Sequence, residues 1–281
     1  MSIEIKTGSA ALIGLEARAN PFTMINPQIK ENLLNLTSSV TDTLNSVSKS
    51  LFQTKVNHGL NLDMNVAKKT MAKHEYLDVR LVNIPVPEGF KGSYLEYVTM
   101  LQEVFAGMGD IVDDVLVPVS DALSLLVAHP ERATGVTSDA MLKSITYPHQ
   151  VMEEFTVKME EFFVKNGTDE SKPFGDLFER NKDLMTFIEK SITLSKVYDR
   201  RPTPQVIEKI AYLNEVSDLL YVRLKNGQLT DIQNKQADMA AQMLSQAARC
   251  VEMYAALCVL IEQLFSYTAI VYNHVVKVLQ N

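Results

Sequence analysis

From Thr230 to the end, the chain contains no glycine and no proline, the two residues that most often interrupt a helix. A capping box, Thr230 to Gln233, opens this stretch. We therefore predict a single helix from about Thr230 to Leu279, roughly 75 Å long at 1.5 Å per residue. Helices in globular proteins average about 11 or 12 residues, so a helix of this length must dominate the fold.

Apolar residues in this helix follow a seven-residue repeat, which gathers them on one face. The first position of the repeat holds Leu229, Gln236, Met243, Cys250, Leu257, Leu264, Val271 and Val278. The fourth position holds Ile232, Met239, Gln246, Met253, Leu260, Tyr267 and His274, and Ala240, Ala247, Tyr254, Ile261 and Val275 flank both. The pattern predicts a core helix that other helices surround.

A membrane-spanning helix is the alternative interpretation of the same stretch. Residues Met253 to Asn273 have about the length that a bilayer requires. However, Glu262 lies within them, and a carboxylate near the bilayer centre costs about 2.5 to 3.5 kcal/mol. No basic cluster flanks both ends. These features favour a core helix and argue against a membrane partner, but they leave open a membrane-active protein that inserts this helix.

Composition favours long helices and narrows the classes of function. The 281 residues include only 11 Gly and 10 Pro, and the net charge of −7 argues against a general nucleic-acid binder. Cys250 and Cys258, the two cysteines, are eight residues apart on one predicted helix, which is too far for a disulfide. We expect both to be buried thiols in a reducing compartment.

Caps and apolar periodicity predict further helices along the chain. Asn26-Pro27 opens one that ends near His58-Gly59, with an apolar face of Ile29, Leu33, Leu36, Val40, Leu44, Val47 and Leu51. A capping box at Ser93 to Glu96 opens another, which continues to His129-Pro130 with a kink at Pro118. The remaining predicted helices cover 61–74, 148–164, 175–198 and 204–226.

Two segments do not have a helical pattern. Residues 1–25 form a polar arm, and in the segment 76–92 Leu77, Val79 and Leu81 alternate with charged residues before two prolines, which predicts an extended strand. A lone strand leaves an unpaired edge, and polar arms become ordered on partners. We therefore expect subunit contacts at Val79, Leu81, Ile84, Leu12, Ile13 and Leu15. Alternatively, both segments lie over their own helices.

Together these patterns predict an all-α protein, a bundle of six to eight helices with a long C-terminal helix and one extended segment. We expect three parts: an arm at 1–25, a helical part at 26–165 that includes the extended segment 76–92, and a part at 173–281. The last of these holds a helical hairpin and the long helix. The polar connection "KNGTDESKP" separates the second and third parts, which are expected to share one core.

The sequence shows no pattern typical of an active site or a metal site. None of the five histidines is four residues from another histidine or from a cysteine. Asp110, Asp113 and Asp114 fall on the outer face of a predicted helix and lack the loop and glycine of a calcium site. We therefore expect no catalytic residue, metal, cofactor or small-molecule substrate, and no enzymatic activity.

In its overall composition and arrangement of segments, the sequence resembles structural proteins from large tailed bacteriophages. It combines the polar arm "MSIEIKTGSAALIGLEARANPF", helices rich in Ser, Thr and Asn, and the isolated segment "VRLVNIPVPEGF". "GLEARAN" is similar to sites cut by phage prohead proteases, although Gly14 stands where those sites usually carry an aliphatic residue. The resemblance implies a virion protein that assembles in the host cytoplasm with copies of itself or with other virion proteins.

Overall fold

The computed structural model describes residues 27–55, 60, 62–72, 94–108, 110–128, 181–226 and 231–280, with a few isolated positions between 150 and 161. These residues are almost entirely helical, and no strand occurs among them, so the all-α prediction is confirmed for this part of the chain. The predicted arm at 1–25 and the extended segment 76–92 lie outside the described residues.

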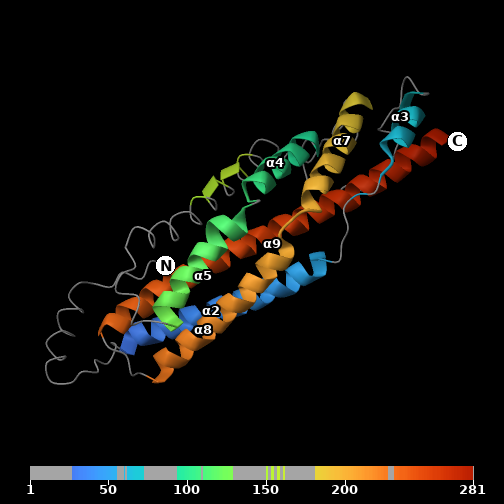
Figure 1. Ribbon diagram of the computed structural model, residues 1–281. Coiled ribbons are helices and arrows are strands. Elements are labelled where there is room, and N and C mark those ends of the chain that lie inside the picture. Colours follow the sequence, from blue (N-terminus) through green and yellow to red (C-terminus); the bar gives the residue numbers. More distant parts are fainter. Residues whose placement is uncertain are drawn as a thin grey trace, which may run out of the picture. The chain divides into compact units, whose positions relative to one another are not determined.

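Seven α-helices and two π-helical turns occur in the described residues (Figure 1). The α-helices are α2 (Pro27–Lys55), α3 (Met64–Ala72), α4 (Tyr94–Gly107), α5 (Val117–Leu123), α7 (Asn181–Tyr198), α8 (Thr203–Asn226) and α9 (Asp231–Gln280). The π-helical turns η2 (Val112–Leu116) and η3 (Ser124–Ala128) flank α5. With its 50 residues, α9 confirms the long C-terminal helix, because nothing in its sequence interrupts the backbone hydrogen bonds.

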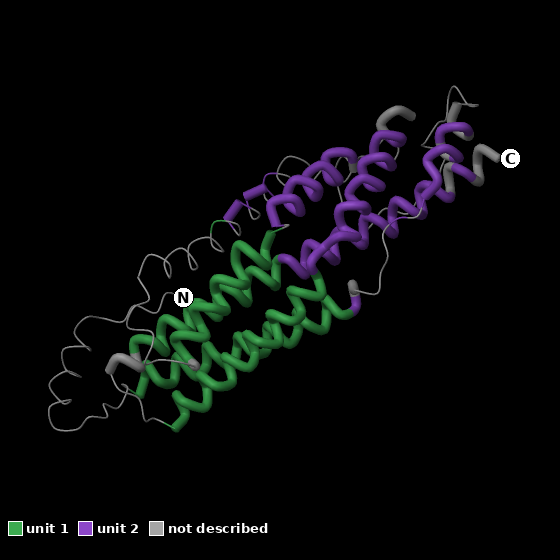
Figure 2. Tube along the Cα trace, viewed as in Figure 1, with its two compact units in different colours: residues 1–52, 110–151, 203–253 green, residues 53–109, 152–202, 254–281 purple. Residues whose placement is uncertain are grey.

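The chain divides into two compact units (Figure 2). Unit 1 contains residues 1–52, 110–151 and 203–253, and unit 2 contains residues 53–109, 152–202 and 254–281. Each unit therefore takes residues from both predicted helical parts, 26–165 and 173–281. The reason is the length of α9, whose first half belongs to unit 1 and whose second half belongs to unit 2.

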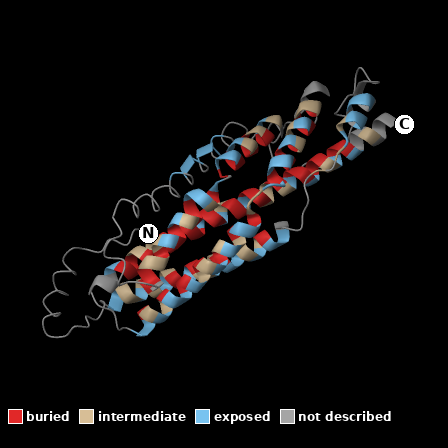
Figure 3. Cartoon of the chain, in the orientation of Figure 1, coloured by how far each residue is buried: buried red, intermediate tan, exposed pale blue. Residues whose placement is uncertain are grey.

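In unit 1, α2 contributes a buried face close to the predicted one (Figure 3). Leu33, Val40, Leu44, Val47 and Leu51 are buried, whereas Ile29 and Leu36 are only half-buried. Thr37, which the apolar pattern passed over, is buried in place of Leu36. Its hydroxyl donates to the carbonyl oxygens of Leu33 and Leu34, both at 3.0 Å, so the polar group is satisfied inside the core.

In unit 2, the core is rich in aromatic residues. The buried aromatic side chains are Tyr97 and Phe105 of α4, Phe187 and Tyr198 of α7, and Tyr254, Phe265, Tyr267 and Tyr272 of α9. Phe187 and Tyr267 meet edge to face, with their ring centroids 6.4 Å apart. Large side chains of this kind bury much apolar area per residue, which stabilises the unit.

The predicted continuous helix from Ser93 to Ala128 is wrong in two respects. First, α4 ends at Gly107, in keeping with the low helix propensity of glycine. Second, the irregularity predicted at Pro118 is a π-helical turn, in which the Val117 N–H donates to the Val112 carbonyl oxygen. Pro118 has no backbone N–H and so cannot donate the hydrogen bond that an α-helix makes at each residue. A wider π-helical turn before the proline accommodates the missing bond.

The seven-residue repeat predicted part of the buried face of α9. First-position residues from Gln236 to Val271 are buried. Among the fourth-position residues whose burial is described, Tyr267 is buried, whereas Met239, Gln246, Met253 and Leu260 are half-buried. The buried arc is completed instead by Ala237, Ala240, Leu244, Ala247, Val251, Tyr254, Cys258, Ile261, Phe265, Thr268 and Tyr272. This arc is wider than a two-position seam, as is typical of a helix that lies inside a core.

Candidate functional site

The residues predicted to form subunit contacts, Leu12, Ile13, Leu15, Val79, Leu81 and Ile84, all lie outside the described residues. Two other predictions are confirmed. Asp110, Asp113 and Asp114 are exposed, as expected for the outer face of a helix, and Cys250 and Cys258 are buried free thiols. Within the described part of the chain, no group of three or more His, Cys, Asp or Glu residues could hold a metal ion.

A buried polar cluster in unit 2 is centred on Tyr198, the last residue of α7. The side chain is only 1% exposed, and its ring packs against Phe105 of α4 and Phe265 of α9, at centroid distances of 5.6 and 5.5 Å. Its hydroxyl donates a hydrogen bond of 2.7 Å to the Glu262 Oε1 of α9. A short bond to a carboxylate oxygen is among the stronger hydrogen bonds in proteins.

Arg201 covers the other side of this cluster. Its guanidinium carbon lies 3.8 Å from the centroid of the Tyr198 ring, a cation–π contact, and one of its N–H groups donates to the Tyr198 carbonyl oxygen at 3.0 Å. The corner "DRRPTP" between α7 and α8 brings Arg201 to this position, because α7 ends at Tyr198 and α8 begins at Thr203. Arg201 therefore helps to position the Tyr198 ring, whose hydroxyl donates to Glu262.

The acid–base properties of the cluster suit a structural role. Burial raises the pKa of the Tyr198 hydroxyl well above its usual value, and the neighbouring Cys258 and Glu262 raise it further. Burial also raises the pKa of the Cys258 thiol to about 12. Because both groups keep their protons at neutral pH, Tyr198 acts as a permanent donor and Cys258 is not a thiolate nucleophile. The arrangement can hold α7 and α9 together, but it activates no nucleophile.

A second buried polar group lies on the part of α9 in unit 1. The Asp238 side chain is 5% exposed; its Oδ2 accepts a hydrogen bond of 2.9 Å from Gln242, while its Oδ1 is buried without a partner. One helical turn beyond Gln242, the Oε1 of Gln246 is also buried without a partner. Burial raises the pKa of the Asp238 carboxyl from 3.8 to about 6, and the Gln242 hydrogen bond opposes the shift.

Polar contacts also join α2 and α8 within unit 1. The Ser217 hydroxyl donates to the Thr37 carbonyl oxygen at 3.2 Å and accepts from the Thr41 hydroxyl at 3.0 Å. Farther along, Asn214 donates to Asn45 at 3.2 Å. Residues later in α2 meet residues earlier in α8, so the two helices run antiparallel. Such matched hydrogen bonds fix the register of the helix pair.

Sequence reasoning missed both buried clusters. It singled out Glu262 as the one charge in an apolar stretch, a signal that the carboxylate needs a donor. It could not name Tyr198 as that donor, because the two residues are 64 positions apart in the chain. Asp238 gave no signal, since it lies outside the two main positions of the seven-residue repeat, where a charged residue is ordinary on an exposed face.

One helix in the described residues is long and apolar enough to cross a membrane. Within the stretch Lys235–Asn273 of α9, an 18-residue window has a mean hydropathy of 1.6, and 56% of that window is buried inside the protein. The central helix of a helical core passes the same test of length and composition, so this observation by itself favours neither interpretation.

Comparisons with protein-family models, with curated proteins and with solved structures gave no match to this chain. The functional argument therefore depends on the residues and contacts described above.

Proposed function

We propose that this protein is a non-enzymatic structural protein that acts through protein–protein contacts, as a component of the virion of a large tailed bacteriophage. The observation that supports this most is α9, a 50-residue helix that contributes buried residues to both compact units. A helix that contributes buried residues to each unit suits a structural protein. The hydrogen bond between Tyr198 and Glu262 links α7 to α9, and those of Ser217 link α8 to α2, in keeping with a scaffold.

In this proposal the contacts between subunits come from the polar arm and the extended segment. Val79, Leu81 and Ile84 in one segment and Leu12, Ile13 and Leu15 in the other supply the apolar side chains. An extended strand with an unpaired edge offers backbone donors and acceptors to a neighbouring chain. The partners are other copies of the chain or other virion proteins, and assembly takes place in the host cytoplasm.

Light scattering on the purified chain tests where the contacts lie. Deleting Ser2 to Asn20 together with Val79→Lys and Leu81→Lys is expected to reduce the mass of the oligomer while helix content by circular dichroism stays the same. The matched control is Leu219→Lys with Val222→Lys, which changes two exposed apolar residues of α8 that are 38% and 51% exposed. A mass that falls only in the control would place the interface on the helices instead. Mass spectrometry of purified virions tests the virion assignment itself.

A second candidate function is a membrane-active protein, similar to a pore-former, that inserts α9. It is based on the stretch Lys235–Asn273, which is long and apolar enough to cross a membrane. Insertion would require Glu262 to leave its hydrogen bond with Tyr198 or to carry that partner into the bilayer. Liposome flotation separates the two candidates, because stable association of the purified chain with vesicles, without added partners, supports insertion and contradicts the structural proposal.

A further inference from the structure

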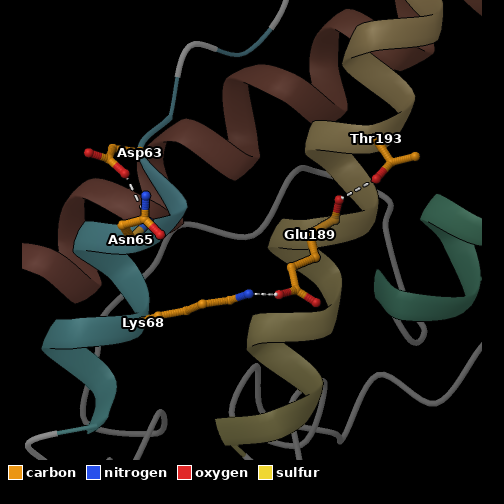
Figure 4. A network of polar contacts seen from close by, with 5 residues as sticks. All are labelled: Asp63, Asn65, Lys68, Glu189 and Thr193. Atoms are coloured by element: carbon orange, nitrogen blue, oxygen red, sulfur yellow. Dashed lines mark hydrogen bonds and ion pairs between the residues drawn. The ribbon is translucent and has the colours of Figure 1, made fainter.

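The exposed side of α7 becomes basic towards the end of the helix. Its carboxylate at Glu189 is already engaged, because the Lys68 Nζ of α3 lies 2.8 Å from the Glu189 Oε1, as Figure 4 shows. Farther along, Lys196 and Arg200 are exposed and form no ion pair within the described part of the chain. Val197 lies between them in the sequence and is 50% exposed. These three residues form a basic patch on unit 2.

The neighbours of the basic patch leave its charge positive. Asp199 is exposed beside it, but Arg201 adds a further positive charge where its guanidinium covers the Tyr198 ring. A cationic surface with an exposed apolar residue at its centre favours a partner that is acidic and also offers some apolar area.

A surface of the opposite charge lies on unit 1. Its residues are the exposed aspartates of the segment that contains η2 and α5: Asp110, Asp113, Asp114 and Asp121. We call them the acidic stripe. Pro118 is exposed within the same segment, and no lysine or arginine occurs from Asp110 to Ala128. Arg223 of α8 contacts the segment, but it donates to the Val127 carbonyl oxygen and not to an aspartate. The acidic stripe therefore has the chemistry of a partner for the basic patch.

Each chain carries both surfaces, so a second copy can supply the partner for either one. Contact between two different surfaces of the same chain leaves one of each kind free, and association can then continue through further copies. Exposed charges add little affinity, because water and salt screen them. They do favour the correct partner and orientation, because like charges that meet in a wrong arrangement repel each other.

We propose that copies of this protein associate head to tail, with the basic patch of one copy against the acidic stripe of the next. This inference rests on the proposed function, in which the polar arm and the extended segment supply the apolar contacts between copies. The two charged surfaces then decide which part of one copy meets which part of the next.

Light scattering over a series of protein concentrations tests this pairing. One variant reverses the acidic stripe with Asp110→Lys, Asp113→Lys and Asp121→Lys, and the other reverses the basic patch with Lys196→Glu and Arg200→Glu. Each variant alone should need an about tenfold higher concentration than wild type to reach the same mass, because like charges now meet. An equimolar mixture of the two variants should regain the wild-type mass, because each then finds the opposite charge on the other.

The matched control is Glu31→Lys with Asp42→Lys and Glu252→Lys, which reverses three exposed carboxylates of unit 1 outside the acidic stripe. It should reach the wild-type mass, and circular dichroism should show the same helix content in every variant. A loss of mass in the control as large as that in the stripe variant would overturn the pairing.

Two further outcomes separate this pairing from the proposed function. If wild type assembles but neither charge reversal changes its mass, or if mixing the two variants restores nothing, the pairing is overturned while the proposed function stands. If wild type stays monomeric, the pairing and the self-assembly fail together, and mass spectrometry of virions still decides the virion assignment.

Discussion

The two halves of α9 pack with different kinds of side chain. In unit 1, five of the buried residues of α9 are alanines, Ala237, Ala240, Ala241, Ala247 and Ala248, and the neighbouring pair α2 and α8 is joined by Ser, Thr and Asn. In unit 2, α9 instead buries Tyr254, Phe265, Tyr267 and Tyr272. Of these, Phe265 contacts the Tyr198 ring and Tyr267 contacts the Phe187 ring, both of α7.

This difference shows how one uninterrupted helix can support two cores. Small side chains let helices approach closely but bury little area each, so hydrogen bonds between helices have a larger share in fixing their register. Aromatic side chains bury about 150–250 Å² each, so unit 2 depends more on shape and apolar area. Substitutions chosen in each unit should therefore have effects of different size and cause.

The largest effect is expected from Tyr198→Ala in unit 2. Removing a fully buried aromatic side chain should lower the free energy of unfolding by about 3 to 5 kcal/mol, because it leaves a cavity and leaves Glu262 without this donor. Chemical denaturation measures the loss, and exchange should increase in α7 more than in α8. Tyr198→Phe, which keeps the ring, should cost only about 1 to 2 kcal/mol; equal costs for both variants would contradict the importance of the ring.

In unit 1, Asp238→Asn is expected to stabilise the protein at pH 7. Because the pKa of Asp238 is raised from 3.8 to about 6 in the folded chain, the folded state binds this proton more tightly than the unfolded state. The stability that results is fully present below pH 3.8, decreases as the pH rises and is lost above about pH 6. Removing the charge should therefore raise the free energy of unfolding at pH 7 by about 1 kcal/mol or more.

Thermal unfolding of wild type and of Asp238→Asn, measured between about pH 4 and pH 8, checks this prediction. The difference in stability between the two proteins should grow in favour of the asparagine variant as the pH rises through about 6. If the difference in stability did not change with pH, burial of the Asp238 carboxylate would not destabilise the folded chain.

A smaller loss is expected from Ser217→Ala, which tests the polar contacts between α2 and α8. The serine hydroxyl both donates to Thr37 and accepts from Thr41, so its removal should cost about 1 kcal/mol. Urea denaturation is a suitable measurement, with Ser46→Ala on the exposed face of α2 as the control. If the two alanine variants are equally stable, the hydrogen bonds of Ser217 do not stabilise the packing of α2 against α8.

The smallest effect is expected from Lys68→Met in unit 2. The variant removes the exposed ion pair with Glu189 and should change global stability by less than about 0.5 kcal/mol. High salt should screen the ion pair and so lower the stability of the wild type slightly. The variant lacks the pair and should not show this loss. If the variant lost more than about 1 kcal/mol in the free energy of unfolding, the exposed ion pair would matter as much as buried contacts do, and the contrast drawn here would be wrong.

Helix positions and most of the buried faces could be predicted from the sequence, because they depend on local properties. The absence of glycine and proline after Thr230 predicted α9, and steps of three and four predicted the buried leucines and valines of α2. The same local reasoning placed Asp110, Asp113 and Asp114 at the surface. The subunit contacts predicted in the arm and at 76–92 stay predictions, since those residues lie outside the described part of the chain.

The sequence by itself determined that this chain is helical, that its last helix is unusually long and that Glu262 is the one charge in an apolar stretch of that helix. Only the tertiary structure decided that Tyr198 is this donor, that Thr37 replaces Leu36 in the core and that α9 is shared by two units. Helix formation depends on residues three or four positions apart, whereas these contacts join residues as far as 180 positions apart, whose meeting depends on how whole helices pack.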